Sequence, residues 1–221
     1  ESGYYGPYTV DDKIYGYPEA VLTPWQSLYV NRDIFDACGI TEDPTTVDEL
    51  IATCNTIREN GYDPIAIGDK DGWPAVILCG DYYAQQTADY GELNKILTGE
   101  DTFPGNEVFR NAFATVVELG QNGAYMSGFS STDHNTAIQA FAAGQTAMLY
   151  CGSWWSSIAG GTDNGFTLDV IQLPLMEGLT DNVSVQLCAD IALLPTKDAN
   201  ESALGKFFDY ISDGGYWTVM G

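Results

Sequence analysis

Tryptophans and carboxylates follow two apolar runs that are suited to buried strands. The segment 69–73 (DKDGW) comes after the run at 65–68, and the segment 152–155 (GSWW) comes after the run at 147–150. Open α/β sheets bind ligands beside the carboxyl ends of their strands. These two segments are therefore the first candidates for a binding site.

The residue types in these segments suit a sugar. A sugar ring packs its C–H face on an aromatic plane, and its hydroxyls bind carboxylates through charge-assisted hydrogen bonds. We therefore predict that Trp73, Asp69 and Asp71 bind a ligand. Asp190 interrupts an apolar strand, so its carboxylate must either face the cleft or find a partner. Trp155 is equally well explained as a core residue.

The same acidic and aromatic residues leave an enzymatic alternative open, because paired carboxylates beside tryptophans are what a glycosidase requires. A calcium loop is disfavoured: an EF-hand that begins at Asp69 needs glycine at its sixth position, and Gly72 is at the fourth. The sequence has no G-x-S-x-G, Walker loop or H-E-x-x-H motif. The only histidine, His134, follows Asp133 at an expected helix start, where capping explains the local sequence. We expect no metal and no cofactor.

The charge of the chain is strongly negative. Its 221 residues include 31 Asp and Glu against 8 Lys and Arg, which gives a net charge of −23. This charge repels phosphate backbones and anionic lipid, so nucleic acid is not an expected partner. A hydrophobic content of 45% is sufficient for the core of a globular protein with two lobes or one large domain. No run of apolar residues is long enough to span a membrane.

The five cysteines show no pattern of a metal or redox site. They form no C-x-x-C pair, and no histidine cluster accompanies them. Their settings are apolar and their number is odd, so we expect mainly free structural thiols. One disulfide remains open if the protein is secreted. The cysteines are Cys38, Cys54, Cys79, Cys151 and Cys188.

Turn and cap residues divide the chain into alternating strands and helices. Thr46 and Glu49 form a capping box, Asn106 and Asn200 cap two further helices, and Gly144 ends a fourth. Strands are expected at 28–30, 65–68, 147–150, 166–173 and 183–194. Each of the three capped helices has an expected apolar stripe. After Thr46 it is Val47, Leu50, Ile51, Cys54 and Ile57. After Asn106 it is Val108, Phe109, Ala112, Phe113, Val116 and Leu119, with Gly120 beyond the end of the helix, and after Asn200 it is Leu204, Phe207, Phe208 and Ile211.

Several segments resemble the extracellular solute-binding proteins of ABC importers, in particular the carbohydrate-binding family 1 that includes maltose-binding protein. Residues 141–154 (FAAGQTAMLYCGSW) resemble the family's "FaaGkaAM…GsW" segment. Residues 11–18 (DDKIYGYP) resemble its "dGKiYGvP" segment, and residues 28–35 (LYVNRDIF) resemble "lfYNkdlf". The resemblance extends over nearly the whole chain.

The resemblance implies an α/β fold of the type II periplasmic-binding-protein kind, with two lobes joined by hinge strands near Tyr17-Pro18 and Leu173-Pro174. Residues 1–18 would be a remnant of the N-terminal lobe with the first hinge. Residues 19–172 would form the C-terminal lobe, and residues 173–221 the second hinge and the return into the N-terminal lobe. By the same resemblance, the secretion signal, the lipid-anchor cysteine and much of the first lobe belong outside this chain.

The family also implies a function and two further site residues. Trp154 matches the tryptophan of "GsW", which lies against the ligand, and Trp25 stands where family members place a cleft residue. The implied protein is an extracellular monomer, periplasmic or a cell-surface lipoprotein, that binds a neutral oligosaccharide between its lobes and delivers it to ABC permease subunits. A glycosidase, and a binding protein for another small neutral or cationic solute such as a polyamine, are the alternatives.

Overall fold

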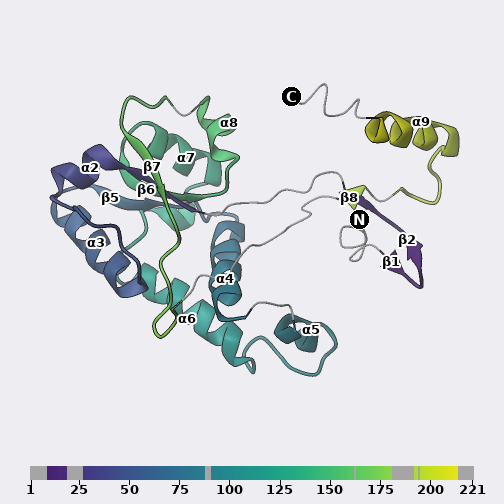
Figure 1. The fold of residues 1–221 in the computed structure, drawn as a ribbon, viewed down its shortest axis with the longest axis horizontal. Coiled ribbons are helices and arrows are strands. Elements are labelled where there is room, and N and C mark those ends of the chain that lie inside the picture. Colours follow the sequence, from purple (N-terminus) through teal and green to yellow (C-terminus); the bar gives the residue numbers. More distant parts are fainter. Residues whose placement is uncertain are drawn as a thin grey trace. The chain divides into compact units, whose positions relative to one another are not determined.

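The computed structural model describes residues 9–18, 27–87, 91–161, 163–180, 192–193 and 195–213. The chain divides into two compact units (Figure 1). The larger unit is Pro24–Gln186, and the smaller one combines Glu1–Thr23 with Leu187–Gly221.

The described residues of the larger unit are built on a four-stranded mixed sheet. Its strands are β4 (Ser27–Asn31), β5 (Asp63–Ala66), β6 (Thr146–Cys151) and β7 (Leu168–Ile171), in the spatial order β5-β6-β4-β7. β5 and β6 are parallel, with Ile65 opposite Met148. β4 is antiparallel to both β6 and β7, with Leu28 opposite Tyr150 and Ile171. The carboxyl ends of β5 and β6 therefore lie at the same end of the sheet.

Helices cover both faces of this sheet (Figure 1). Side chains on one face, such as Val30 and Met148, pack with the helices α3 (Val47–Glu59), α4 (Trp73–Gln86) and α6 (Glu107–Gln121). Side chains on the other face, such as Tyr29 and Leu149, pack with α7 (His134–Ala142) and α8 (Trp155–Ala159). Because both faces are covered, every residue of β6 is buried, as the uninterrupted apolar run predicts. This unit also contains the helices α2 (Arg32–Ala37) and α5 (Gly91–Leu97) and the 3-10 helix η2 (Phe129–Ser131).

The predicted helix caps are confirmed. The Glu49 amide donates to Thr46 Oγ1 at 3.3 Å, and the Thr46 amide donates to Glu49 Oε2 at 3.2 Å. Asn106 and Asp133 accept from the third residue of α6 and α7 through their side-chain oxygens. Gly144 has φ +69°, the left-handed conformation that ends α7. These features are local in sequence, which is why the residue types alone reveal them.

Three details of the expected elements are wrong. Phe207, expected on the apolar stripe of the last helix, is 44% exposed, and the other two details concern the helix that Asn106 caps. α6 contains Gly120 and ends at Gln121, and Gly123 with φ +70° supplies the left-handed residue instead. Phe113 is 47% exposed, because the buried face of α6 centres on Phe109, Ala112 and Leu119 and leaves residue 113 at its edge. A glycine and a helical spacing of apolar residues do not by themselves determine where a helix ends or which of its faces the rest of the protein covers.

The described part of the smaller unit contains short strands and a helix. β1 (Thr9–Val10) pairs with β2 (Lys13–Ile14), and β3 (Tyr17–Pro18) pairs antiparallel with β8 (Ala192–Leu193). The helix α9 (Glu201–Ser212) starts at Asn200, whose side chain accepts from the Ala203 amide at 3.0 Å. The expected hinge segment at Tyr17-Pro18 thus has its strand partner late in the chain.

The segment expected to be the second hinge belongs to the larger unit. Leu173 is buried in its core, and the carbonyl of Pro174 accepts from Gln85 Nε2 at 3.1 Å. The Leu175 amide donates to the Thr45 carbonyl, and the Leu175 carbonyl accepts from the amide of Val47, the first residue of α3. The assignment of residues 1–18, 19–172 and 173–221 to the lobes of a longer protein stays a prediction. Among the described residues, no helix has the length and apolar character needed to cross a membrane.

Candidate functional site

Three chain segments meet at the end of the sheet where β5 and β6 terminate. Residues 67–72 connect β5 to α4, and residues 152–154 connect β6 to α8. α7 precedes β6, is joined to it by the short turn 143–145 and packs on it in the opposite direction. The first residue of α7 therefore lies at the same end of the sheet as the last residue of β6. Parallel pairing of β5 with β6 therefore brings together residues that are far apart in sequence.

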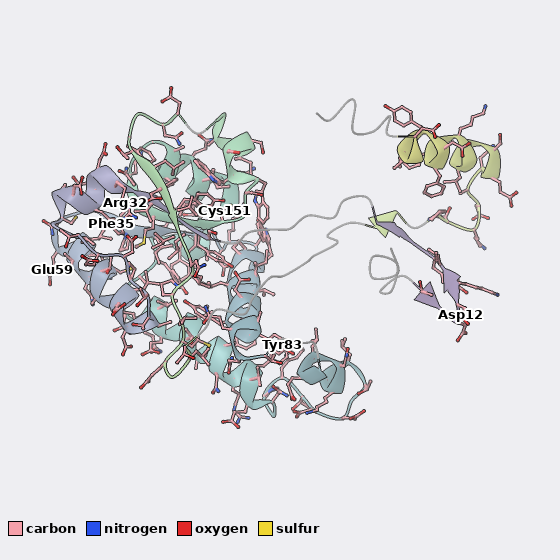
Figure 2. The ribbon with its side chains drawn as sticks, viewed as in Figure 1. Asp12, Arg32, Phe35, Glu59, Tyr83 and Cys151 are labelled. Carbon is pink, nitrogen blue, oxygen red and sulfur yellow. The ribbon has the colours of Figure 1, made fainter. Side chains whose placement is uncertain are left out.

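His134 lies between the two predicted tryptophans. Its ring centroid is 4.4 Å from that of Trp73, in an edge-to-face arrangement of 61°, and 6.5 Å from that of Trp154. The Trp154 indole Nε1–H donates to His134 Nε2 at 3.3 Å. The thiol of Cys151, a residue labelled in Figure 2, lies 3.6 Å from the same nitrogen. The structure thus assembles an aromatic cluster of Trp73, His134 and Trp154, which we call the Trp–His–Trp cluster.

The position of Trp154 depends on Gly152. A Cβ atom on Gly152 would lie 2.0 Å from the Trp154 ring, so only glycine lets the indole fold back over the turn. Trp154 is half-buried, whereas Trp155 is only 2% exposed and packs against Tyr29 and Phe141. The two neighbouring tryptophans therefore differ in role: Trp155 belongs to the core, and Trp154 keeps part of its surface in solvent.

Trp73 opens α4 beside the predicted carboxylates. It is 38% exposed, and it follows Gly72, whose φ of +77° turns the chain into the helix. The Asp69 carboxylate accepts from the Ala75 amide at 3.0 Å, so it satisfies one of the unpaired donors of the helix start. Asp71 is exposed in the turn. Asp69 is thus occupied by the protein itself, and Asp71 is open to solvent.

Close packing at Gly68 holds the loop after β5 against the start of α7. A Cβ atom on Gly68 would lie 2.3 Å from the Asp133 carbonyl oxygen, so the loop after β5 can touch the start of α7 only with glycine there. The amides of Asp69 and Lys70 donate to the carbonyls of Phe129 and Thr132 at 2.9 and 3.1 Å. These contacts fix the distance between Trp73 and His134.

Burial keeps the polar groups of the cluster neutral. Desolvation lowers the pKa of His134, while the charge of the neighbouring Asp133 opposes this shift as the smaller effect. Burial also raises the pKa of the Cys151 thiol to about 12. A neutral imidazole that accepts at Nε2 carries its proton on Nδ1, and an un-ionised thiol is a poor nucleophile. The cluster can therefore stack and hydrogen-bond a ligand, but it does not contain an activated Cys–His pair.

The remaining predicted residues have other outcomes. Trp25 and Asp190 lie outside the described residues. In the described part of the chain, no three His, Cys, Asp or Glu side chains gather in a way that could hold a metal. Cys38, Cys54, Cys79 and Cys151 are free, as predicted, and Cys188 is outside the described residues. His134 is the member of the cluster that sequence reasoning missed, because Asp133 does cap α7 and that local explanation seemed complete.

The fold is that of the two-lobed periplasmic solute-binding proteins. A family model described as bacterial extracellular solute-binding protein matches residues 2–213, and the chain belongs to this family. An uncharacterized ABC transporter extracellular-binding protein from Pyrococcus horikoshii is 28% identical over 195 residues, which is 83% of this chain and 40% of that protein.

Solved structures agree with this fold. One, described in connection with xylan utilization by the thermophilic bacterium Caldanaerobius polysaccharolyticus, has a TM-score of 0.65 and 26% identity, and the match covers 81% of this chain and 45% of that one. The bacterial solute receptor AcbH, described as having an exclusive preference for β-D-galactopyranose, has a TM-score of 0.68 and 24% identity, with 96% and 53% covered. The chain therefore spans about half the length of these relatives or less.

Proposed function

We propose that this chain is part of an extracellular carbohydrate-binding protein of an ABC importer, and that the Trp–His–Trp cluster forms one side of its sugar site. A neutral oligosaccharide would stack on the exposed surfaces of Trp73 and Trp154. The bound protein would then deliver the sugar to membrane permease subunits. No bond of the sugar is made or broken in this proposal.

The observation that carries the proposal is the convergence of two solvent-accessible indoles at the carboxyl ends of parallel strands. Trp73 and Trp154 come from different segments, both contact His134, and each keeps part of its surface in solvent. Indole faces are the surfaces on which the C–H faces of sugars pack. The match to a solved structure connected with xylan utilization supports a carbohydrate as the ligand class.

Charge also favours a neutral ligand over an anionic one. The chain carries a net charge of −23, and the loop before Trp73 contains Asp69 and Asp71 with Lys70 as its single basic residue. Asp71 is exposed and can accept hydrogen bonds from sugar hydroxyls. A small cationic solute would also suit this charge, so it is the main competing ligand class in the test below.

The test is a thermal-shift screen of mono- and oligosaccharides and polyamines on the intact protein, because ligand binding to the native state raises its melting temperature. Calorimetry with the best ligand then compares wild type with Trp154→Ala and Trp73→Ala. We expect each variant to lose about 2 kcal/mol of binding free energy, or about thirtyfold in affinity. Tyr62→Ala is the matched control, since Tyr62 is 37% exposed and has no ring contact with the cluster. Unchanged affinity in both tryptophan variants would exclude the cluster as the site.

Asp71→Asn separates binding from catalysis. If Asp71 accepts sugar hydroxyls, the variant should bind more weakly than wild type by a smaller step than Trp154→Ala, and no product should appear from wild type. Release of shortened oligosaccharide that Asp71→Asn abolishes, with binding retained, would favour the glycosidase instead. Product is measured by chromatography of the ligand after long incubation with each protein.

A further inference from the structure

His134 holds the indole of Trp154 through a hydrogen bond that depends on its protonation state. Trp154 Nε1–H donates to His134 Nε2 at 3.3 Å, and an indole N–H can only donate. Nε2 can accept this bond only while it carries no proton. A doubly protonated imidazolium would present an N–H to the indole N–H, so the bond would be lost and the two rings would repel at that point.

The packing around Trp154 holds its indole only in part. The indole lies over Gly152, packs against the buried cluster that includes Cys151 and Trp155, and keeps part of its surface in solvent. The imidazole itself is fixed by Trp73 at 4.4 Å and by its position as the first residue of α7. The bond to His134 therefore adds a directional contact to this packing and orients the half-buried indole.

We propose that His134 is a positioning residue for Trp154, and that protonation of His134 at acidic pH releases the indole and weakens ligand binding. The second half of this proposal rests on the proposed function of the Trp–His–Trp cluster. The first half concerns the ligand-free protein alone. The protein would hold its ligand at neutral pH and bind it less tightly in acidic surroundings.

Titratable and charged groups face His134 from three segments. On its own helix, Asp133 favours the protonated imidazole, but Asp133 is itself bonded to Thr136 and attracted by Lys70. From β6, the Cys151 thiol stays protonated and adds no charge. The loop that leads to Trp73 carries Asp69, Lys70 and Asp71. Burial outweighs the charge of Asp133 and lowers the pKa of His134 from its ordinary value, so the neutral form prevails at neutral pH.

The first test needs no ligand. The intact protein is labelled with ¹⁵N-tryptophan, and the indole N–H resonance of Trp154, assigned from the Trp154→Phe variant, is followed from pH 7.5 to pH 4.5. We expect this resonance to shift with a midpoint below pH 6.5 in wild type. In His134→Gln it should stay constant, because the glutamine Oε1 can accept from the indole and does not titrate. A wild-type resonance that does not move, or an identical shift in His134→Gln, would overturn the proposal.

The second test measures binding of the best sugar from the thermal-shift screen, with xylo-oligosaccharides in the panel, over the same pH range. Wild-type affinity should fall by up to about tenfold for each pH unit below the midpoint, the limit for uptake of one proton. His134→Gln should bind with an affinity that does not change over this pH range, because its side chain does not titrate, whereas His134→Ala should bind more weakly than wild type at pH 7.5 and likewise show no decline. Equal pH profiles in wild type and His134→Gln would refute the regulatory half. If no sugar binds at any pH, the proposed function fails, and the indole resonance still decides whether His134 positions Trp154.

Discussion

The phenol of Tyr150 donates a hydrogen bond of 2.6 Å to the carboxylate of Asp81, and both side chains are buried in the core of the larger unit. Tyr150 is on β6, four residues before Trp154, and Asp81 is on α4, the helix that Trp73 opens. One buried bond therefore connects the two elements that carry the indoles. It also places a carboxylate where ionisation is unfavourable, which has consequences for stability.

The stability of the protein should depend on pH through Asp81. Burial raises the pKa of Asp81 from 3.8 to about 6, and the bond from Tyr150 only partly opposes this. A carboxyl group with a raised pKa favours folding while it is protonated, and this contribution is lost as the pH rises from about 3.8 to about 6. The loss amounts to about 3 kcal/mol.

Asp81→Asn removes this ionisation and keeps an oxygen that can accept from Tyr150. Relative to wild type, the variant should gain stability between pH 4 and pH 7, by up to about 3 kcal/mol. Urea denaturation at several pH values checks this, with the exposed Asp71→Asn as control, which should follow the wild-type profile. Parallel profiles for Asp81→Asn and wild type would contradict the prediction.

Tyr82 should tolerate the loss of its hydroxyl. Tyr82 is fully buried, and among the described residues its hydroxyl has no hydrogen-bond partner. It lines an interior cavity of about 10 Å³ together with Tyr125 and Tyr150. Because an unpartnered buried hydroxyl costs about 1–3 kcal/mol, Tyr82→Phe should leave stability unchanged or raise it within this range.

Tyr150→Phe is the matched control for Tyr82→Phe. It removes the same atom from a buried tyrosine but leaves Asp81 without its donor, so the free energy of unfolding should fall by about 1–3 kcal/mol. Guanidinium denaturation of the three proteins at pH 7.5 gives the comparison. Equal destabilisation by the two substitutions would show that the Tyr82 hydroxyl has a partner in solution.

Gly68→Ala should both displace the start of α7 beside the Trp–His–Trp cluster and destabilise the fold. The added methyl would lie 2.3 Å from the Asp133 backbone oxygen, and a backbone atom cannot rotate away as a flexible side chain can. We expect a loss of about 1–3 kcal/mol in unfolding free energy, measured by denaturation. Gly205→Ala is the control, because no atom lies within 4 Å of its Cβ position and it is inside α9. A neutral Gly68→Ala would mean that α7 can shift without cost.

The thiols should react in an order set by burial. Cys38 is partly exposed, whereas Cys54, Cys79 and Cys151 are buried and have raised pKa values of about 12, about 11 and about 12. In native protein we expect Cys38 to react first with a disulfide reagent and the three buried thiols to react only as the protein opens. Under denaturing, non-reducing conditions at least four thiols should be titrated. A count of three or fewer would indicate a disulfide.

Residue types and short-range spacing determined much of the local structure. The capping box of Thr46 and Glu49, the cap of Asn106 and the left-handed Gly144 follow from backbone groups that must be satisfied within a few residues. The apolar run of β6 predicted a strand buried on both faces, and the "GsW" resemblance predicted the family that the comparison confirms.

Tertiary structure alone decided how the candidate site is assembled. His134 looks like an ordinary residue at a helix start, and its contact with Trp73 and Trp154 arises from the parallel pairing of β5 with β6 and the close approach at Gly68. The occupation of Asp69 by the α4 amide is likewise a product of the folded turn. Local sequence fixes which groups need partners, but which distant groups become those partners depends on strand register and helix packing, and these are settled only when the whole core forms.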